Sequence, residues 1–150
     1  FSKSRNLAGL RVGFALGQQE LITALNQIKN SFNSYPLDRL AQAGAAAAIR
    51  DREYFAEITA KVIKTREWVI PALRELGFQV PDSRTNFVFI SHPEIPGAQL
   101  FQLLRERGIL VRYYNQPRIE NYLRVTIGTD EEMHTFLREL SRIIKNRCAS

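Results

Sequence analysis

The spacing of the apolar residues changes about halfway along the chain, and this change constrains the fold more than any other feature. Between residues 21 and 76, apolar side chains recur every three or four residues, which is the spacing of amphipathic helices. After residue 77, short apolar runs alternate with segments of helical spacing, a pattern typical of strands packed against helices. The pattern predicts an α/β fold in which a helical first half leads into a second half that contains a sheet.

Three helices are expected in the first half. The first ends at the turn-forming run 33–36, the second begins after Asp38, whose carboxylate can cap it, and the third ends near Gly77. Residues 1–10 have no helical spacing and are expected to form a loop. A strand is expected to follow from Arg11 to Leu16.

Strands and helices are expected to alternate in the second half. The run 86–90 is almost wholly apolar, which is typical of a strand covered on both faces. In the run 122–127 the apolar residues share one face, so Arg124 is expected to point away from it. Further strands are expected at 78–80 and 109–112, with a helix at 98–107 that Gly108 ends and a last helix that opens with the capping box 129–132.

The composition favours a soluble, cytoplasmic protein. No apolar stretch reaches the roughly 18 residues of a membrane span, and the single cysteine, Cys148, cannot form an internal disulfide. The net charge of +6 is compatible with a nucleic-acid partner, but the arginines are dispersed, which is more typical of separate anion sites. His92 and His134 have no other ligands at metal spacing, so no metal site is expected.

The first fourteen residues concentrate groups that can carry chemistry. Lys3 is followed by two cations, Arg5 and Arg11. A lysine forms an imine through its neutral amine, and neighbouring cations favour that neutral form. A turn at Gly9 would return Arg11 to the same pocket, where its planar guanidinium can bind a phosphate, and Ser2 can add a hydroxyl. The run therefore predicts an amine beside a phosphate site.

This run, with Ser2-Lys3 followed by Leu7-Ala8-Gly9-Leu10-Arg11, closely resembles the lysine segment of fold-type I aminotransferases that depend on pyridoxal 5′-phosphate (PLP). Within that superfamily it is most similar to the histidinol-phosphate aminotransferases. The resemblance implies that residues 1–70 are the C-terminal part of the large PLP-binding domain with its connecting helix. Residues 71–150 would then be the small C-terminal α+β domain, and the full-length protein would be a homodimer.

The resemblance also implies roles for individual residues. Lys3 would be catalytic and, with Ser2 and Arg11, would bind the cofactor. Arg124, in a segment similar to one whose arginine holds the substrate carboxylate, would bind the substrate by a two-pronged salt bridge. Arg112 would help to receive the substrate phosphate. Arg5 departs from the family, in which a small residue often stands, and it is expected to be neutral to function.

Asn86 and Tyr35 also stand at positions where the family lines its site. An asparagine that opens a strand and a tyrosine before a proline have sufficient structural explanations, so neither is assigned a role.

The implied reaction moves an amino group between glutamate or 2-oxoglutarate and a phosphorylated imidazole substrate, in histidine biosynthesis. Close relatives that act on aromatic amino acids or decarboxylate threonine phosphate share this framework and remain alternatives. The family takes further cofactor contacts from residues that precede the lysine, so this chain alone is expected to be inactive. The remaining alternative comes from a different class of protein: a small RNA-binding module that presents Phe87 and Phe89. The resemblance to aminotransferases instead implies small-molecule partners, with no nucleic acid and no membrane.

Overall fold

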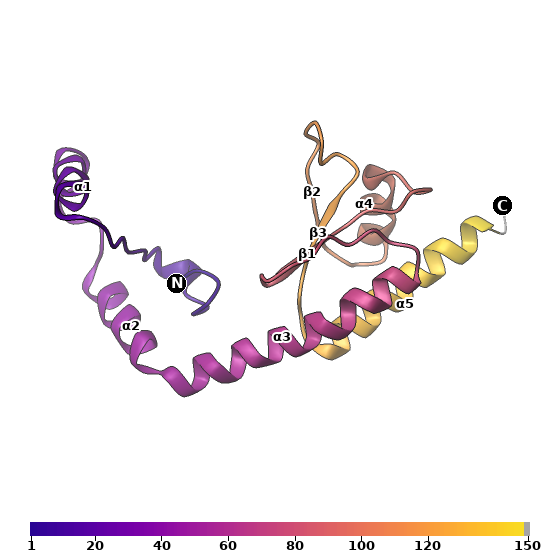
Figure 1. Ribbon diagram of the computed structural model, residues 1–150, viewed down its shortest axis with the longest axis horizontal. Coiled ribbons are helices and arrows are strands. Elements are labelled where there is room, and N and C mark those ends of the chain that lie inside the picture. The colour runs from indigo at the N-terminus through magenta and orange to yellow at the C-terminus, as the bar shows by residue number, and fades with distance from the viewer. Residues whose placement is uncertain (149–150) are drawn as a thin grey trace. The chain divides into compact units, whose positions relative to one another are not determined.

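The computed structural model describes residues 1–148, and their contacts divide the chain into two compact units after Thr59. Figure 1 shows the elements in chain order, from an N-terminal loop through three helices to a small sheet with two further helices. Helix α3, Arg52–Glu75, begins in the first unit and ends in the second. Each unit has a core of its own.

The first unit is helical. A short 3-10 helix, η1 (Ala8–Leu10), precedes α1 (Gln19–Phe32) and α2 (Arg39–Arg50). Its core is small: Val12, Ala41 and Ala45 are buried, and the apolar side chains that pack on them are those of Phe1, Leu10 and Leu37. Asp38 caps α2 as predicted, because its carboxylate accepts a hydrogen bond of 2.7 Å from the backbone N–H of Ala41.

The strand predicted from Arg11 to Leu16 is wrong. Arg11 adopts a left-handed turn conformation, and residues 12–18 have no regular secondary structure. A strand needs a neighbouring strand to accept its backbone hydrogen bonds. Within the described part of the chain, no segment pairs with these residues.

One face of α1 is apolar but exposed. Leu21, Leu25, Ile28 and Phe32 follow one another at helical spacing, and each is at least half exposed. The periodicity that predicted the helix is thus confirmed, while the side chains it was expected to bury are not covered by the described residues.

The second unit is built on a three-stranded antiparallel sheet in the order β1-β3-β2. The strands are β1 (Phe87–Ile90), β2 (Arg112–Tyr113) and β3 (Leu123–Thr126), and the helices are α4 (Gly97–Glu106), α5 (Asp130–Cys148) and the second half of α3. The unit's core combines Val88 and Ile90 of β1 with Leu104 of α4 and Leu140 of α5. The residues of α3 that enter it include Val69 and Leu73.

The start of α5 is tied to α3 by side chains. The hydroxyl of Thr65 and the indole N–H of Trp68 donate hydrogen bonds of 2.7 and 2.8 Å to the carboxylate of Asp130. The bonds from Thr65 and then Trp68 hold the pKa of Asp130 below its ordinary value. The imidazole of His134 stacks on Trp68 with ring centroids 4.4 Å apart. These contacts fix α5 beside α3, as Figure 1 shows.

The predicted ends of the helices are largely confirmed. Gly77 and Gly108 follow α3 and α4 with φ of 86° and 74°, the left-handed conformation that glycine adopts readily. The capping box predicted at 129–132 is also present. The N–H of Thr129 donates to the Glu132 carboxylate at 2.8 Å, and the N–H of Glu132 donates to the Thr129 hydroxyl at 3.2 Å.

Three predictions for strands need correction. Residues 78–80 contribute only one bridge, between Gln79 and Ser91, and β2 starts at Arg112, where the predicted strand ended. In β1, Val88 and Ile90 are buried, but Phe87 and Phe89 are half-buried on the opposite face. The described helices cover one face of the sheet, and an apolar run cannot show from sequence alone how many faces are covered.

The contacts divide the chain between Thr59 and Ala60, whereas the sequence placed a domain boundary near residue 70. The difference arises inside α3, because Val69 and Leu73 are fully buried in the second core. The helix itself is continuous through Pro71. No helix among the described residues is long and apolar enough to cross a membrane, and the side chain of Cys148 lies outside the described residues.

Candidate active site

The loop that carries Lys3 folds back on itself. The backbone N–H groups of Arg5 and Leu7 both donate to the carbonyl of Phe1, at 3.1 and 3.3 Å. The ring of Phe1 meets the ring of Phe14 edge to face at 5.6 Å. These contacts close residues 1–14 into a compact loop, with Lys3 on its exposed side.

Lys3 and Ser2 have polar groups that are free to bind a ligand. Among the described residues, the Lys3 ammonium forms no hydrogen bond and no ion pair. The hydroxyl of Ser2, on a half-buried residue, likewise has no hydrogen-bond partner in the described part of the chain. An amine and a hydroxyl therefore lie next to each other in sequence without competing protein partners.

Arg11 lies in the same loop in an unusual backbone conformation. Its φ is 54° and its ψ is 31°, a left-handed conformation that is uncommon for residues other than glycine. The exposed guanidinium donates to the carbonyl of Ala8 at 3.2 Å, which bends the side chain back over η1. Backbone strain of this kind often accompanies a functional site. The structure thus keeps Ser2, Lys3 and Arg11 on one short loop.

Arg5 is occupied elsewhere. Its guanidinium donates to the carbonyls of Ala48 and Asp51, at 2.8 and 3.1 Å, and lies 3.8 Å from the centre of the Phe55 ring. These carbonyls belong to the C-terminal end of α2, where cations are favourable. Arg5 therefore anchors the lysine loop to α2, a role that its sequence position did not show.

A second anchor comes from Gly44, in the middle of α2. A Cβ atom at this position would lie 2.9 Å from a terminal methyl carbon of Leu10. The glycine lets Leu10, the residue before Arg11, approach α2 closely. The side chains of Arg5 and Leu10 thus hold the lysine loop to α2 at two points.

Two arginines occur together in the second unit. Arg112 of β2 and Arg124 of β3 are partners in the register of the antiparallel pair. Side chains directly opposite on such strands start about 5 Å apart, and like charges in that arrangement are unfavourable. No carboxylate among the described residues forms an ion pair with either guanidinium. The pair is therefore a strong local site for an anion.

Arg124 points away from the apolar face of β3, as predicted. It is half-buried between two neighbours in β3 that are fully buried, and its guanidinium lies over the rings of Phe87 and Tyr114, at 5.3 and 5.9 Å. Its Nε atom is buried and has no hydrogen-bond partner among the described residues. An unpaired buried donor on a cation is costly, and a bound anion would satisfy it.

Tyr114 was not singled out from the sequence. Its ring lies 5.4 Å from the Arg112 guanidinium and stacks on Phe89, with the planes only 9° apart. A sequence signal did exist, because residues two apart on a strand share a face. Tyr114 is two residues after Arg112 and directly follows β2, which ends at Tyr113.

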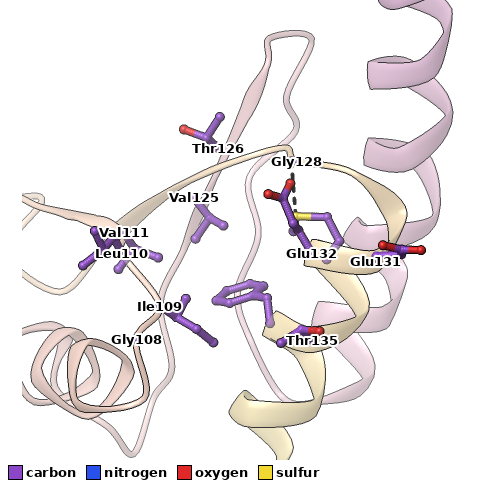
Figure 2. A pocket seen from close by; sticks show the side chains of 12 residues that line it. Gly108, Ile109, Leu110, Val111, Val125, Thr126, Gly128, Glu131, Glu132 and Thr135 are labelled. Atoms are coloured by element: carbon purple, nitrogen blue, oxygen red, sulfur yellow. Dashed lines mark hydrogen bonds between the residues drawn. The ribbon is translucent and has the colours of Figure 1, made fainter.

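Two hollows border the sheet. The larger, about 620 Å³, is lined by the segment 108–111, by Val125 of β3 and by the start of α5 (Figure 2). Its lining includes the carboxylates of Glu131 and Glu132 but no arginine or lysine. The negative charge of this hollow is therefore unfavourable for a phosphate or a carboxylate ligand. The smaller, about 360 Å³, is lined partly by Phe87 and Phe89, on the face that carries Arg124.

The remaining candidates have structural explanations. Asn86 accepts a hydrogen bond from Ile127 through its backbone carbonyl and extends the pairing of β1 with β3, and Tyr35 is an exposed turn residue. His92 accepts a hydrogen bond from the backbone of Glu94. Within the described part of the chain, no group of histidine, cysteine or carboxylate side chains could hold a metal ion.

The structure brings the predicted residues together in two sets. Ser2, Lys3 and Arg11 share one loop in the first unit, and Arg112 and Arg124 form a pair in the second. Each set is well defined in itself. That the two sets act in one site remains a prediction.

Known proteins resemble this chain over nearly its whole length. Residues 1–140 match the family model described as aminotransferase class I and II. The chain is 54% identical over 143 residues to a histidinol-phosphate aminotransferase of Clostridium botulinum, and 57% identical over 143 residues to one of Gluconacetobacter diazotrophicus. Each match covers 95% of this chain and 40% of the relative. The chain thus spans about two fifths of the length of these curated relatives.

A solved structure gives the same result. The histidinol-phosphate aminotransferase of Sinorhizobium meliloti, determined in complex with pyridoxal-5′-phosphate, matches with a TM-score of 0.85 and 26% identity, over 97% of this chain and 40% of that one. The RNA-binding reading is not favoured, because the family match includes the segment with Phe87 and Phe89. The fold is that of part of a fold-type I aminotransferase, and the chain belongs to the aminotransferase class I and II family.

Proposed function

We propose that this chain is part of a PLP-dependent aminotransferase that transfers an amino group between histidinol phosphate and 2-oxoglutarate, in histidine biosynthesis. The observation that carries the proposal is the match at 53–57% identity to proteins named histidinol-phosphate aminotransferase, over 95% or more of this chain. The arginine pair supports it, because both substrates are anions and two adjacent cations without acidic partners suit them.

The residues of the first unit fit the cofactor. PLP requires an amine for its aldehyde and donors for its phosphate. The lysine loop offers the ammonium of Lys3 and the hydroxyl of Ser2, neither of which is paired with another described residue, and the exposed guanidinium of Arg11. Among the described residues, no carboxylate pairs with Lys3 or Arg11, so a phosphate would meet no competing anion.

Lys3 would hold the cofactor covalently and, once released by the incoming amine, act as the base. In that role its amine removes a proton from the substrate Cα and returns one to C4′ of the cofactor. PLP, when bound, supplies the electron sink that makes this Cα proton removable. Arg11 and Ser2 would bind the cofactor phosphate, and Arg5 would hold the loop against α2 while the proton moves.

The arginine pair would orient the substrate. Arg124, whose Nε has no partner among the described residues and whose guanidinium lies against two rings, would bind a carboxylate in the two-pronged manner. Arg112 is more exposed and would contribute to binding the substrate phosphate. In this proposal residues 1–70 belong to the large domain and residues 71–150 to the small one.

The proposed enzyme is a cytoplasmic homodimer. The exposed apolar stripe of α1 supports association, because a stripe of this size is unfavourable in water. A subunit contact is one arrangement that covers it. Sedimentation of the full-length protein tests this: a monomer at micromolar concentration would contradict the proposed dimer.

The decisive experiment changes Lys3 in the full-length protein. Wild-type protein is expected to take up PLP with the visible absorption of a lysine-bound cofactor, and Lys3→Ala is expected to lose that absorption and all turnover. Arg52→Ala, an exposed arginine outside the lysine loop, serves as the control and should keep both. An unchanged spectrum in Lys3→Ala would remove Lys3 from the reaction.

The substrate is tested separately. Histidinol phosphate and aromatic amino acids are titrated into the PLP-loaded protein, and the cofactor spectrum is followed. Conversion by histidinol phosphate at lower concentration supports the proposal. Conversion by aromatic amino acids alone would assign the protein to the aromatic alternative, and release of carbon dioxide from threonine phosphate would assign it to the decarboxylases.

A further inference from the structure

We propose that Tyr114 is the positioning residue of the arginine pair: its ring holds Arg112 and Arg124 side by side, so that both guanidinium groups act on one anion at a time, the phosphate of the amine substrate or a carboxylate of the 2-oxo acid. The inference rests on the proposed function only for the identity of the substrate. The cluster itself is defined by distances within the second unit.

The ring of Tyr114 is the contact that the two arginines share. The guanidinium carbon atoms of Arg112 and Arg124 lie 5.4 and 5.9 Å from its centroid. Both distances are within the roughly 6 Å over which an aromatic ring attracts a cation. Arg124 also lies 5.3 Å from a second ring, that of Phe87, whereas among the described residues Arg112 has a cation–ring contact with Tyr114 alone. Loss of Tyr114 therefore frees Arg112 and loosens Arg124.

Tyr114 is itself held by the sheet. Its ring stacks on Phe89 of β1, with centroids 6.3 Å apart and planes at 9°, and Phe89 in turn contacts Tyr122 at 5.9 Å. Phe89 is the register partner of Arg124. The Tyr114 ring thus rests on β1, the neighbour of the strand that carries Arg124, while its backbone directly follows the strand that carries Arg112.

The charges explain why the pair needs such support. Two like charges on opposite strands repel, and no carboxylate among the described residues neutralises them. Without the Tyr114 ring, the side chains of Arg112 and Arg124 would move apart into solvent, since each side chain gains rotamer freedom there. The negative face of an aromatic ring attracts both cations, and the buried unpaired Nε of Arg124 shows a donor that the protein leaves open.

The hydroxyl of Tyr114 is not part of this role. It forms no hydrogen bond with the described residues. The proposal therefore separates the ring from the hydroxyl: Tyr114→Phe keeps the ring, and Tyr114→Leu removes it while keeping an apolar side chain against Phe89.

The first test measures anion binding without catalysis. The 150-residue chain, labelled at arginine Nε, is titrated with inorganic phosphate while the Nε–Hε signals are followed by NMR. The signals of Arg112 and Arg124 are expected to shift together, with one midpoint. In Tyr114→Leu that midpoint should rise by about five- to thirtyfold, the effect of losing two cation–ring contacts, and in Tyr114→Phe by less than about twofold.

Tyr122→Leu is the matched packing control. This variant also removes a tyrosine ring from Phe89, but within the described part of the chain Tyr122 has no cation–ring contact with an arginine. Its phosphate midpoint should equal that of the wild type. If Tyr122→Leu weakens binding as much as Tyr114→Leu, general packing rather than positioning is responsible, and the proposal fails. It also fails if Tyr114→Phe is as weak as Tyr114→Leu, because the hydroxyl would then be the group that matters.

The second test uses the full-length, PLP-loaded protein. Tyr114→Leu should raise KM for the phosphorylated amine by about five- to thirtyfold with kcat within about twofold, and Tyr114→Phe should restore KM. An unchanged KM in Tyr114→Leu would overturn the inference. The proposed function and the role of Tyr114 are tested independently. If Lys3 plays no part in turnover, the phosphate titration still tests Tyr114. If Tyr114→Leu binds phosphate like the wild type, the Lys3→Ala spectrum still tests the proposed function.

Discussion

Replacement of Arg5 by alanine should free the lysine loop from α2. In the structure the Arg5 guanidinium donates two hydrogen bonds to carbonyls at the end of α2 and covers the Phe55 ring at 3.8 Å. A hydrogen bond from a charged donor contributes about 1.5–3 kcal/mol, and a cation–ring contact at an exposed site about 0.5–1 kcal/mol. One of the two hydrogen bonds is exposed, so we expect a total loss of about 2–3 kcal/mol.

The loss should be local, and hydrogen exchange is the assay that detects it. The backbone amides of the last turn of α2 and of Asp51 should open more readily, because their helix end loses its cation. A decrease of about 2 kcal/mol in the free energy of opening raises the exchange rate about thirtyfold. Fluorescence of Trp68 would miss the effect, because Trp68 lies in the second unit.

Lys3→Ala is the matched control on the same loop. The Lys3 side chain is exposed and forms no hydrogen bond or ion pair with the described residues, so its removal should change the free energy of opening of these amides by less than about 0.5 kcal/mol. If Arg5→Ala exchanges at the wild-type rate, Arg5 does not anchor the loop and the reasoning is refuted. If both variants exchange faster, the loop is stabilised by its cations in general rather than by the contacts of Arg5.

Three further predictions follow from single sites. Because hydrogen bonds from Thr65 and Trp68 lower the pKa of Asp130, this carboxylate should stabilise the fold above pH 3.8 and lose that effect as the pH falls through its lower folded pKa. Urea unfolding followed by Trp68 fluorescence should therefore depend less on acid pH in Asp130→Asn than in the wild type. Gly97→Ala should lower the free energy of unfolding by about 1–3 kcal/mol, since its Cβ would lie 2.9 Å from backbone atoms of the loop before β3; an unchanged urea midpoint would contradict this. Arg124→Lys should raise KM for the 2-oxo acid about ten- to a hundredfold in the full-length protein, because a lysine cannot form the two-pronged contact, and an equal KM would exclude that contact.

Much of the local structure was predictable because it depends on neighbours in sequence. The cap at Asp38, the box formed by Thr129 and Glu132, and the helix ends at Gly77 and Gly108 were all expected. In each case the interacting groups lie within a few residues of one another. Chain connectivity alone brings such groups together, so their residue types are sufficient evidence.

Strands were predicted less well because they depend on distant partners. The runs 11–16, 78–80 and 109–112 have apolar residues suited to strands, yet the first pairs with nothing in the described chain, the second makes one bridge and the third pairs only from Arg112. Which face of the sheet is covered by helices likewise depends on the tertiary structure. Apolar composition favours burial, but it does not specify which element provides the cover.

The sequence alone indicated the family and the residue types of the predicted site: Ser2, Lys3 and Arg11 in one segment, with Arg112 and Arg124 in two others. Only the tertiary structure showed what holds them. Arg5 reaches carbonyls more than 40 residues away, and Tyr114 lies against an arginine from a strand ten residues later. The order of residue types in a motif indicates which reaction the side chains can carry out. Which side chains contact one another across the fold is decided only when helices and strands pack together, so the contacts that hold the motif residues in place could not be predicted from the sequence.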